Sequence, residues 1–390
     1  MRSLRIVHVL DTNRLHVGSV VQMMEAVRLL AERGHRLVVV SRPGGDLGGP
    51  CADAGVTLQE LRFAGRVDLP TAAGLRWILR AERPDIVHVH NELPHATALI
   101  AATGLGRHPR LVVDRGVSFP LDRLNRWKYR HPRVGAVVCV AEAVRRVVVE
   151  TGRVRPERVH VIHPGTDTGR FHPDRADGGR VRAELGIGPS DPVIVQVSLR
   201  RWKGWRELLA AVASVRVRIP DVRLLLVGED PSDRVAEVIR SLGLAATAVR
   251  VVPFRQDMPD LLAAADVVVD ASWAGTGITG TIREAMALER AVLATSCGGN
   301  RELVVDGTGV LVPPLDVDAL SAALGRLLED PELRRRLGRS GRRRVAEQFT
   351  SERRVDRLEA LYRRVASDGP ASGRVRGGEL LISAQPSPGR

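Results

Sequence analysis

Runs of Val, Ile and Leu alternate with longer helical segments through most of the 390-residue chain, and this alternation narrows the choice of folds more than any other feature. Continuous apolar runs without polar alternation are typical of parallel strands that are covered on both faces. The pattern predicts an α/β fold with a doubly wound parallel sheet. In the first half of the chain, the expected strands are residues 4–10, 36–41, 56–62, 85–90, 110–116, 136–141 and 159–165.

A second series of strands begins after a Gly-, Pro- and Asp-rich stretch at 163–179. Its expected strands are residues 193–199, 224–229, 249–254, 267–272, 291–296 and 309–314. We therefore expect two α/β domains, residues 1–168 and 191–330, joined by a linker at 169–190. Two facing units of this kind create an interdomain cleft, and each sheet binds its ligand at the carboxyl ends of its strands. The rest of the chain is predicted to be a helical region and a disordered tail, residues 331–366 and 367–390.

The composition fits a globular protein from a reducing compartment. The chain is 44% hydrophobic and 27% charged, and no apolar run reaches the roughly 18–20 residues that a membrane-spanning helix needs. The N-terminus lacks the small-residue cleavage site of a signal peptide. The three cysteines, Cys51, Cys139 and Cys297, fit neither a disulfide framework nor a metal-ligand spacing. We therefore expect a cytoplasmic protein.

Positive charge is concentrated in the N-terminal half. The net charge is +14, and residues 1–170 hold 26 basic and 16 acidic side chains, which accounts for 10 of the 14. Such a field attracts anionic partners such as phosphates and lipid headgroups. Within this half, residues 121–133 mix five cations with Trp127 and Tyr129. This segment is predicted either to dock on an anionic membrane surface or to form a solvated helix face, and no nucleic-acid partner is expected.

The turn after the first strand argues against a nicotinamide or flavin enzyme. A dinucleotide fold requires G-x-G-x-x-G there, and residues 11–19 contain only Gly18. A single glycine still lets backbone N–H groups approach an anion at the start of a helix. Gly18 is therefore either part of an anion site or a simple turn residue.

Two basic residues follow the first strand of the second domain, in the sequence RRWKG at 200–204. Arg200 and Lys203 would lie at the carboxyl end of this strand, in the loop that opens a helix. A guanidinium fork and a point charge that face a cleft suit a diphosphate. The alternative is that both side chains are solvated, as most basic residues are.

The segment 273–290 carries the richest pattern, because Gly275, Gly277 and Gly280 interleave with Thr276, Thr279 and Thr281 ahead of a helix. Backbone N–H groups in such a turn, together with the helix dipole, can hold a phosphate. Glu284 stands three residues after Thr281, which is the spacing of a capping box. A carboxylate that holds ribose hydroxyls is the alternative, and the spacing alone favours the capping box.

His88 and His90 are two residues apart on a predicted strand and so share one face. Paired histidines can bind a metal, but no carboxylate or cysteine joins them at a recognisable spacing. Hydrogen-bonded histidines in the core or at the edge of the cleft are therefore the favoured interpretation.

Taken in order, these motifs resemble those of the retaining glycosyltransferases with the GT-B fold, family 4, also called group 1. The resemblance covers about residues 4–366 and implies two facing Rossmann-like domains. RRWKG is similar to the family's Arg-x-x-Lys-Gly phosphate clamp. The other matching motifs are RGH at 33–35, PDIVHVH at 84–90, VIHPGTD-x-x-x-FHP at 161–173 and REAMALERAVLATSCGGNRELV at 283–304.

The resemblance implies that the C-terminal domain binds a nucleotide-diphosphate sugar, with UDP or GDP expected, and that the N-terminal domain binds the acceptor. Arg200 and Lys203 would then neutralise the leaving diphosphate, and Glu284 would hold the ribose, which overrides the capping-box preference. No metal or bound cofactor is expected. The further donor contacts would be Gly18, Phe254, Arg255, Thr276, Gly277, Ile278, Thr279 and Gly280, with the backbone near Pro253–Arg255 reading the base. The acceptor-side residues would be His16, His90 and Arg115.

Two positions depart from the family's pattern. Thr276 stands where the family has the first glutamate of its Glu-x7-Glu motif, and Arg115–Gly116 stands where His-Gly is common. A cationic Arg cannot act as a base, so Arg115 is predicted to bind phosphate or an anionic acceptor.

The expected activity is metal-independent transfer of a hexose to a glycan, lipid-linked or small-molecule acceptor. The products would be cell-envelope polysaccharides, lipid-linked glycans or glycosylated metabolites. The enzyme would be cytoplasmic, with peripheral contact at the inner face of the membrane. The alternatives are a sugar-nucleotide epimerase on the same fold and a non-catalytic protein that binds sugar nucleotides or glycans.

Overall fold

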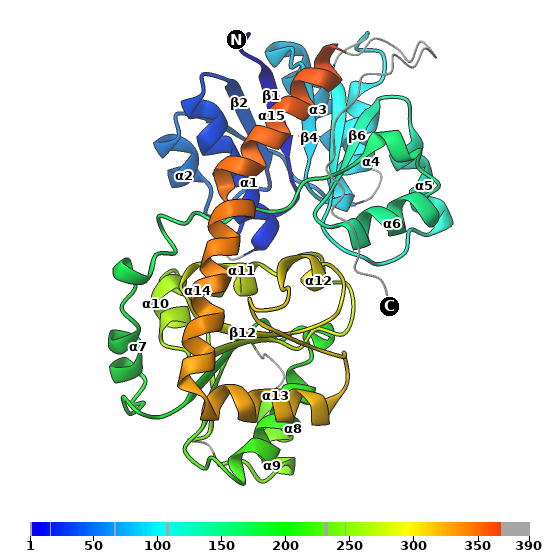
Figure 1. The fold of residues 1–390 in the computed structure, drawn as a ribbon. Helices are drawn as coiled ribbons and strands as arrows, with labels where there is room; N and C mark the ends of the chain where they lie inside the picture. Colours follow the sequence, from blue (N-terminus) through cyan, green and yellow to red (C-terminus); the bar gives the residue numbers. More distant parts are fainter. Residues whose placement is uncertain are drawn as a thin grey trace.

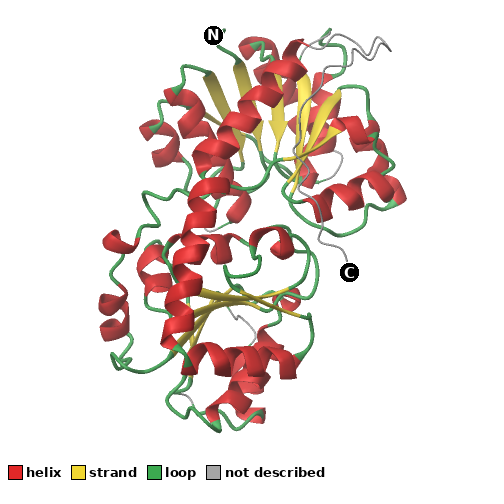
Figure 2. Cartoon of the chain, in the orientation of Figure 1, coloured by secondary structure: helices red, strands yellow, loops and turns green. Residues whose placement is uncertain are grey.

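The computed structural model describes residues 2–15, 17–65, 68–106, 109–229, 233–245 and 247–367. Within these ranges the chain forms two parallel sheets, each covered by helices (Figures 1 and 2). The two sheets with their helices confirm the predicted fold class of two Rossmann-like α/β domains.

The first sheet has seven strands and the second has six. The strands of the first sheet are β1 (Arg5–Val9), β2 (Arg36–Ser41), β3 (Thr57–Glu60), β4 (Ile86–Val89), β5 (Arg110–Arg115), β6 (Val134–Cys139) and β7 (Val159–Val161). Those of the second sheet are β8 (Val193–Val197), β9 (Arg223–Val227), β10 (Val249–Val252), β11 (Val267–Asp270), β12 (Ala291–Thr295) and β13 (Val310–Val312).

The helices fill the connections between these strands. The α-helices of the first domain are α1 (Gly18–Glu32), α2 (Gly48–Asp53), α3 (Leu69–Glu82), α4 (Glu92–Ala102), α5 (Arg123–Arg130) and α6 (Glu142–Glu150). Those that follow are α7 (Gly178–Glu184), α8 (Trp205–Arg216), α9 (Arg234–Ser241), α10 (Met258–Ala263), α11 (Gly280–Ala287), α12 (Asn300–Leu303), α13 (Val317–Glu329), α14 (Pro331–Gln348) and α15 (Ser351–Ser367). Short 3-10 turns are η1 (Pro156–Arg158), η2 (Pro173–Arg175) and η3 (Arg201–Lys203).

The strand order fixes where ligands can bind. The first sheet has the order β3-β2-β1-β4-β5-β6-β7, and the second has the order β10-β9-β8-β11-β12-β13. In each sheet the chain moves outward to one edge and then returns to the middle, so the switch points lie between β1 and β4 and between β8 and β11. The carboxyl ends of strands at such switch points are where open α/β sheets bind ligands.

The last helix returns to the first domain. Helix α14 runs beside the second domain and α15 beside the first, so the two helices extend along both domains (Figure 1). Val355, Leu358 and Tyr362 of α15 are buried in the same apolar cluster as Val27 of α1 and Ile6 of β1. Burial of this apolar face holds the two domains together from one side.

The chain also crosses between the domains just before the predicted linker. Thr166 forms a parallel bridge with Thr350, where the return crossing from α14 to α15 begins. The buried Arg283 of α11 donates to Thr166 Oγ1 and to the Gly165 carbonyl oxygen, both at 2.6 Å. The two crossings are therefore bound to each other and to the second domain.

The predicted linker, residues 169–190, contains a helix. Helix α7 lies inside the segment predicted as a linker and packs on α10, because Gly178 lies against the backbone of Ala263. Except for Ser367, the predicted disordered tail lies outside the described residues. Among the described residues, no helix combines the length and apolar character that crossing a membrane would require.

Candidate active site

A buried carboxylate lies at the carboxyl end of β11, where the sequence analysis expected a ligand. Oδ1 of Asp270 accepts hydrogen bonds from Lys203 Nζ at 3.1 Å and Ser272 Oγ at 2.7 Å. Oδ2 accepts from Thr279 Oγ1 and Asn300 Nδ2, both at 2.9 Å. Asp270 and these four partners are called the donor-side cluster, after the ligand that the sequence predicts for this domain. Its members come from four segments of the second domain, so one carboxylate fixes them relative to one another.

The charge state of Asp270 follows from these contacts. Burial alone would raise the pKa of this carboxyl, but the Lys203 ammonium and the hydrogen bonds from Asn300, Ser272 and Thr279 hold the pKa below its usual value. Asp270 is therefore ionised at neutral pH and forms an ion pair with Lys203, whose side chain is 18% exposed. An ammonium has three N–H donors, of which Asp270 takes one.

The backbone at the end of η3 places Lys203 against β11. Gly204 has a φ of +67°, and a Cβ at this position would collide with the carbonyl oxygen of Ala271. Glycine is therefore required for η3 to approach the end of the neighbouring strand this closely. The side-chain amide of Gln196 on β8 joins the same two segments, since it donates to the Lys203 carbonyl oxygen and accepts from the Ala271 N–H, both at 3.1 Å.

Arg200, the second predicted cation, is held differently. Its side chain is exposed, and its guanidinium lies 5.5 Å from the centre of the Trp202 ring. Trp202 in turn meets Phe119 of the first domain edge-on, with 6.1 Å between ring centres. Arg200, the N-cap residue of η3, thus lies beside Trp202, which contacts the first domain.

The loop from Gly275 to Gly280 packs closely against other backbone. Side-chain atoms at Gly277 would collide with Val140 and with the Gly116 carbonyl oxygen. Ile278 is buried in the apolar core, so only its backbone can face a ligand. Thr276 is also buried, and its hydroxyl donates to the Ala274 carbonyl oxygen at 3.3 Å. No carboxylate occurs between Asp270 and Glu284, so the loop is neutral.

The capping box predicted from Thr281 and Glu284 is wrong. Helix α11 begins at Gly280 with Thr279 as its N-cap residue, so Thr281 already lies inside the helix. Thr279 makes no capping hydrogen bond with its side chain, because its hydroxyl donates to Asp270 instead. Glu284 is half-buried, and burial raises its pKa against the opposing effects of Arg283 and Arg170. This carboxylate is left available for a ligand role.

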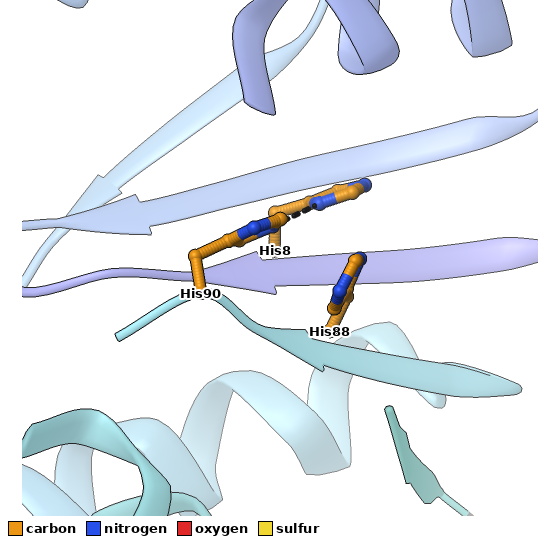
Figure 3. A group of neighbouring side chains, drawn as sticks. All are labelled: His8, His88 and His90. Carbon is orange, nitrogen blue, oxygen red and sulfur yellow. Dashed lines mark hydrogen bonds between the residues drawn. The ribbon is translucent and has the colours of Figure 1, made fainter. Parts of the chain in front are cut away.

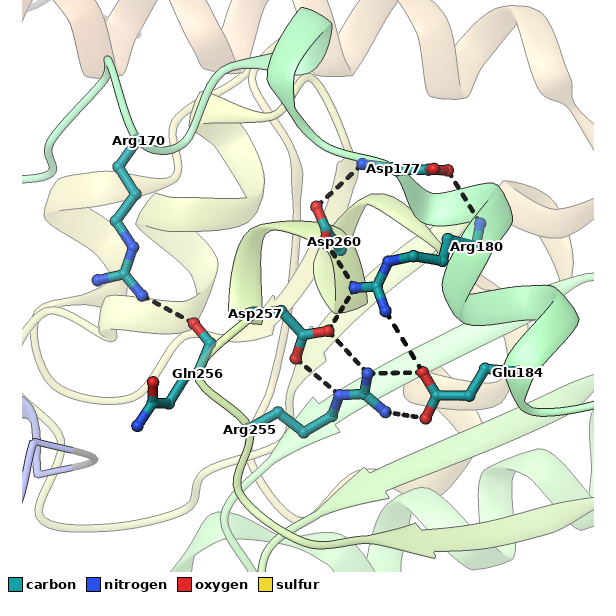
Figure 4. Close-up of polar contacts among 8 residues, drawn as sticks. All are labelled: Arg170, Asp177, Arg180, Glu184, Arg255, Gln256, Asp257 and Asp260. Carbon is teal, nitrogen blue, oxygen red and sulfur yellow. Dashed lines mark hydrogen bonds and ion pairs between the residues drawn. The ribbon is translucent and has the colours of Figure 1, made fainter.

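The segment predicted to read the base is fixed by a network of ion pairs (Figure 4). Arg255 binds Glu184 of α7 through both terminal nitrogens, the Nη2 contact measuring 2.8 Å, and binds Asp257 at 2.7 and 2.8 Å. These contacts raise the pKa of Arg255. Its side chain is therefore committed to structure, while Phe254 is half-buried against the core. With the Arg255 side chain ion-paired, base reading by the backbone of this segment stays a prediction.

The two domains meet at the loop that follows β5. Gly116 contacts Gly277, and Ser118 Oγ donates to the Thr276 carbonyl oxygen at 3.4 Å. On the other side of the loop, Glu302 of α12 accepts from the backbone N–H groups of Glu142 and Ala143, at 2.9 and 3.2 Å. A carboxylate at a helix N-terminus is favourable, so Glu302 links α6 to the second domain.

Arg115 ends β5 at this junction and is buried with a second cation. Its Nη2 donates to the Phe119 carbonyl oxygen at 2.8 Å, and its Nη1 lies 3.8 Å from Glu92. The buried Lys128 of α5 lies 3.6 Å from the other oxygen of the same carboxylate. Arg115, Lys128 and Glu92 are called the acceptor-side cluster, after the ligand that the sequence predicts for the first domain. Glu92 is the first residue of α4, and its side chain is 43% exposed.

The burial of Lys128 changes the interpretation of segment 121–133. Lys128 and Tyr129 face inward, so neither a membrane surface nor a solvated face describes them. Trp127 is 50% exposed, and Arg123 and Arg130 are exposed on the same helix. The outward face of α5 therefore carries fewer cations than its sequence suggests.

Three buried histidines gather on one face of the first sheet (Figure 3). Residues of α1 and α15 belong to the apolar cluster on this face. His8 and His88 are register partners on β1 and β4, and His90 follows two residues later. The carboxylate of Asp114 on β5 accepts from His88 Nε2 and His90 Nδ1, both at 2.8 Å. Burial would raise the pKa of Asp114, but His88 and His90 hold the pKa well below its usual value.

These contacts define the tautomers of the histidine cluster, which comprises His8, His88, His90 and Asp114. Since Asp114 is ionised, His90 Nε2 is the acceptor for His8 Nδ1 at 2.8 Å. His88 Nδ1 lies 2.6 Å from the Tyr362 hydroxyl, within hydrogen-bond distance. Each ring places a nitrogen within 4.8 Å of the others, which is also the composition of a metal-binding group. Among the described residues, every ring nitrogen of the cluster has a partner except His8 Nε2, so we interpret the cluster as a hydrogen-bonded core network.

Two predicted site residues add little to this geometry. His16 lies outside the described residues. Gly18 begins α1, is exposed and has no neighbour within 4 Å of the position of a Cβ, so both of its interpretations remain open. Asp270, Glu92, His8 and Asp114 were not predicted from the sequence. Asp270 and Asp114 each left a local signal, since a carboxylate follows an apolar run near the end of the strands VVVD and RLVVDR.

Comparison with protein families gives two matches in chain order. Residues 17–170 match the family described as "Glycosyltransferase Family 4". Residues 191–330 match the family described as "Glycosyl transferases group 1". The two matches cover the first domain and the second domain.

Individual proteins extend these matches. An alpha-maltose-1-phosphate synthase from Mycolicibacterium smegmatis is 33% identical over 344 residues, which cover 79% of this chain and 86% of that protein. A D-inositol 3-phosphate glycosyltransferase from Segniliparus rotundus is 35% identical over 280 residues, which cover 66% of this chain and 58% of that protein. The crystal structure of Anabaena Alr3699/HepE in complex with UDP-glucose superposes with a TM-score of 0.81 at 21% identity, covering 93% of this chain and all of that one. That likeness supports the two-domain fold.

Proposed function

The chain belongs to the group 1 glycosyltransferases of family 4, and we propose that it moves a hexose from a nucleotide-diphosphate sugar to an acceptor hydroxyl with retention of configuration. The donor would bind the second domain and the acceptor the first. The observation that carries this proposal is the donor-side cluster at the switch point between β8 and β11. It presents a fixed cation where an α/β sheet binds its ligand.

Arg200 and Lys203 would stabilise the diphosphate as it leaves. The bond between the sugar and the diphosphate breaks, and negative charge builds on the phosphate oxygen. The Lys203 ammonium is held at 3.1 Å from Asp270 and keeps further N–H donors for that oxygen. Arg200, exposed on the same loop, would add a guanidinium fork.

The proton of the acceptor hydroxyl would pass to the departing phosphate oxygen. In this retaining mechanism the acceptor attacks from the face that the diphosphate leaves, so both reactants must be held on one side of the sugar. Contact between Gly116 and Gly277 brings the acceptor domain to the edge of the loop that would hold the sugar. Positioning and charge stabilisation would then carry the catalysis, and the proposed reaction needs no metal.

The uncharged loop from Gly275 to Gly280 would influence which sugar the site accepts. The hydroxyls of Thr276 and Thr279 are committed to Ala274 and Asp270, so sugar hydroxyls would meet backbone groups of the loop rather than a carboxylate. Glu284 would hold the ribose. We propose UDP or GDP as the nucleotide, and the complex of Anabaena HepE with UDP-glucose gives UDP a structural precedent in this fold.

The test is a thermal-shift panel of UDP, GDP, dTDP, CDP and ADP with their sugar conjugates. A ligand at about 100 times its dissociation constant adds about 2.7 kcal/mol to the free energy of unfolding. Lys203→Ala should weaken binding of the selected nucleotide by about 1.5–3 kcal/mol, because a charge-assisted hydrogen bond is lost. Arg201→Ala, which removes a neighbouring exposed cation, is the matched control. No shift with any nucleotide would contradict the proposal and favour a protein without transferase activity.

We also propose peripheral contact with an anionic membrane through the outward face of α5. Trp127 offers an exposed indole between the exposed cations Arg123 and Arg130. Such a face suits the interface of an anionic bilayer, and each cation near the surface contributes about 1 kcal/mol. Charge reversal at Arg123 and Arg130 should reduce co-sedimentation with anionic vesicles. Equal sedimentation of variant and wild type would remove the membrane from the proposal, and with it the preference for lipid-linked or cell-envelope products.

A further inference from the structure

Arg283 of α11 is a buried cation whose hydrogen-bond partners are neutral. The residue is 2% exposed, and it donates from Nε to Thr166 Oγ1 and from Nη2 to the Gly165 carbonyl oxygen, both at 2.6 Å. Its third nitrogen, Nη1, has no hydrogen-bond partner in the part of the chain that the structure describes. Burial lowers the pKa of Arg283, and the charges of Glu284 and Glu25 oppose this only in part. A buried cation without a paired carboxylate costs stability, so packing alone does not account for this arginine.

The crossing that Arg283 binds is also held by the first domain. The side-chain amide of Gln22 on α1 accepts from the Gly165 N–H and donates to the Gly165 carbonyl oxygen, both at 2.8 Å. The Gly165 carbonyl oxygen therefore takes one donor from each domain. The Thr166 N–H donates to the Phe349 carbonyl oxygen at 2.8 Å, where α14 passes into α15. The guanidinium of Arg283 thus reaches the point where both crossings meet α1.

The other side of Arg283 leads to the donor. Arg283 directly precedes Glu284, the carboxylate proposed to hold the ribose, and α11 lies on the side of the second domain that faces the first (Figure 1). The N-cap residue of this helix, Thr279, donates to Asp270 of the donor-side cluster. One short helix is therefore attached to the donor-side cluster at its start and to the crossing at Arg283. Glu284 keeps a fixed place relative to both.

We propose that Arg283 is a positioning residue for glycosyl transfer. By binding Gly165 and Thr166, it holds α11, and with it the bound donor, at one angle to the first domain. This inference rests on the proposed function, because it places the donor on the second domain and the acceptor on the first. Transfer requires the acceptor hydroxyl to lie against one face of the sugar, and a change of angle at the crossing would move it away. Arg283 should therefore govern turnover more than nucleotide affinity.

Hydrogen–deuterium exchange of the ligand-free protein tests whether Arg283 fixes the crossing. Arg283→Lys keeps the positive charge but replaces the planar fork by a single ammonium. The amides of Gly165 and Thr166 should then exchange faster by about tenfold or more, while those of β8 keep the wild-type rate. Arg290→Lys is the matched control, because Arg290 donates to carbonyl oxygens within the second domain. It should change exchange at the crossing by less than about twofold. Equal exchange in Arg283→Lys and wild type would overturn the inference.

Steady-state kinetics then test the effect on turnover. The donor is the sugar nucleotide that the thermal-shift panel selects, and the acceptors are glucose, myo-inositol and their 1-phosphates. Arg283→Lys should lower kcat by about tenfold or more and leave the nucleotide dissociation constant within about threefold of wild type, because the Lys203 and Glu284 side chains remain. Thr166→Val, which removes the hydroxyl acceptor of Arg283, should lower kcat by about threefold or more, and Thr166→Ser should restore it. A purely structural arginine would instead lower kcat and the number of nucleotide sites per chain together.

The outcomes separate this inference from the proposed function. An unchanged kcat per nucleotide site in Arg283→Lys and Thr166→Val would overturn the inference, as would an equal loss in Arg290→Lys. Thr166→Val replaces Arg283→Lys in both experiments if the lysine variant does not fold. If no nucleotide binds at all, the proposed function fails, and the exchange experiment still decides whether Arg283 fixes the crossing. If a nucleotide binds but none of these acceptors is used, the exchange rates decide the inference.

Discussion

The two charge clusters of this protein differ in how closely their carboxylates are held. On the donor side, Asp270 accepts four hydrogen bonds of 2.7–3.1 Å and is buried. On the acceptor side, Glu92 is half-exposed and lies 3.6 and 3.8 Å from its two cations. A buried carboxylate with four short contacts holds its neighbours in place before any ligand arrives. The difference predicts that Asp270 contributes more to the stability of the fold than Glu92 does.

The largest effect is expected at the donor side, from Asp270→Asn. The amide keeps the shape of the side chain but removes the charge that pairs with Lys203, and its NH2 group faces donors. Breaking a buried ion pair by removing one partner costs about 3–5 kcal/mol, so the free energy of unfolding should fall by about this amount. Urea denaturation followed by fluorescence measures it, and nucleotide binding should weaken in parallel.

The matched control for this variant is Ser272→Ala, which removes one neutral hydrogen bond from the same carboxylate. It should cost about 1 kcal/mol. A loss of less than about 1 kcal/mol for Asp270→Asn would show that the donor side is not preorganised by this carboxylate, and the contrast between the clusters would disappear.

The fold could be predicted from the sequence because its signals are local. Each expected strand is a short apolar run, and the fully buried faces of parallel strands make these runs continuous. The carboxyl edge of each sheet could be named as the ligand side, because the pattern predicts parallel strands. Lys203 could be placed at a strand end for the same reason, since its position depends only on the element beside it.

The clusters could not be predicted, because their members are distant in the chain. Tyr362 reaches His88 across 274 residues, and the return of α15 to the first sheet has no local signature. Lys128 was expected at the surface because its neighbours in sequence are basic, but packing of α5 on the first domain turns it inward. Which face of a short polar helix is buried is decided by tertiary contacts rather than by helical periodicity.

The two domains also differ in their histidine content, and therefore in how their stability should respond to low pH. All eleven histidines of the chain precede residue 173, and the second domain has none. Burial, and to a smaller extent the proximity of His88, lowers the pKa of His90 to about 4. Burial also lowers the pKa of His8. The unfolded chain binds protons near pH 6.5, so between about pH 6.5 and 4 it holds more protons than the folded chain. Stability should therefore decrease as the pH falls through this window, by up to about 1.4 kcal/mol per pH unit for each such histidine.

Hydrogen–deuterium exchange resolved by domain measures this effect. Exchange in β1, β4 and β5 should accelerate between pH 6.5 and 4.5 beyond the intrinsic pH dependence, while β8 and β11 should stay protected. His90→Gln should flatten the response of the first domain. Equal acid sensitivity of the two domains would show that the buried histidines do not control the stability of the first one.

The smallest effect on stability, and the sharpest test of the contrast, is expected from Glu92→Gln. Its carboxylate is half-exposed and makes no contact shorter than 3.6 Å with either cation, so its removal should change the free energy of unfolding by less than about 1 kcal/mol. Urea denaturation, carried out in parallel with that of Asp270→Asn, measures this change. A destabilisation as large as that of Asp270→Asn would mean that Glu92 is a structural anchor of Arg115 and Lys128. The carboxylate of the acceptor-side cluster would then be held as firmly as that of the donor-side cluster, and the contrast between the two would disappear.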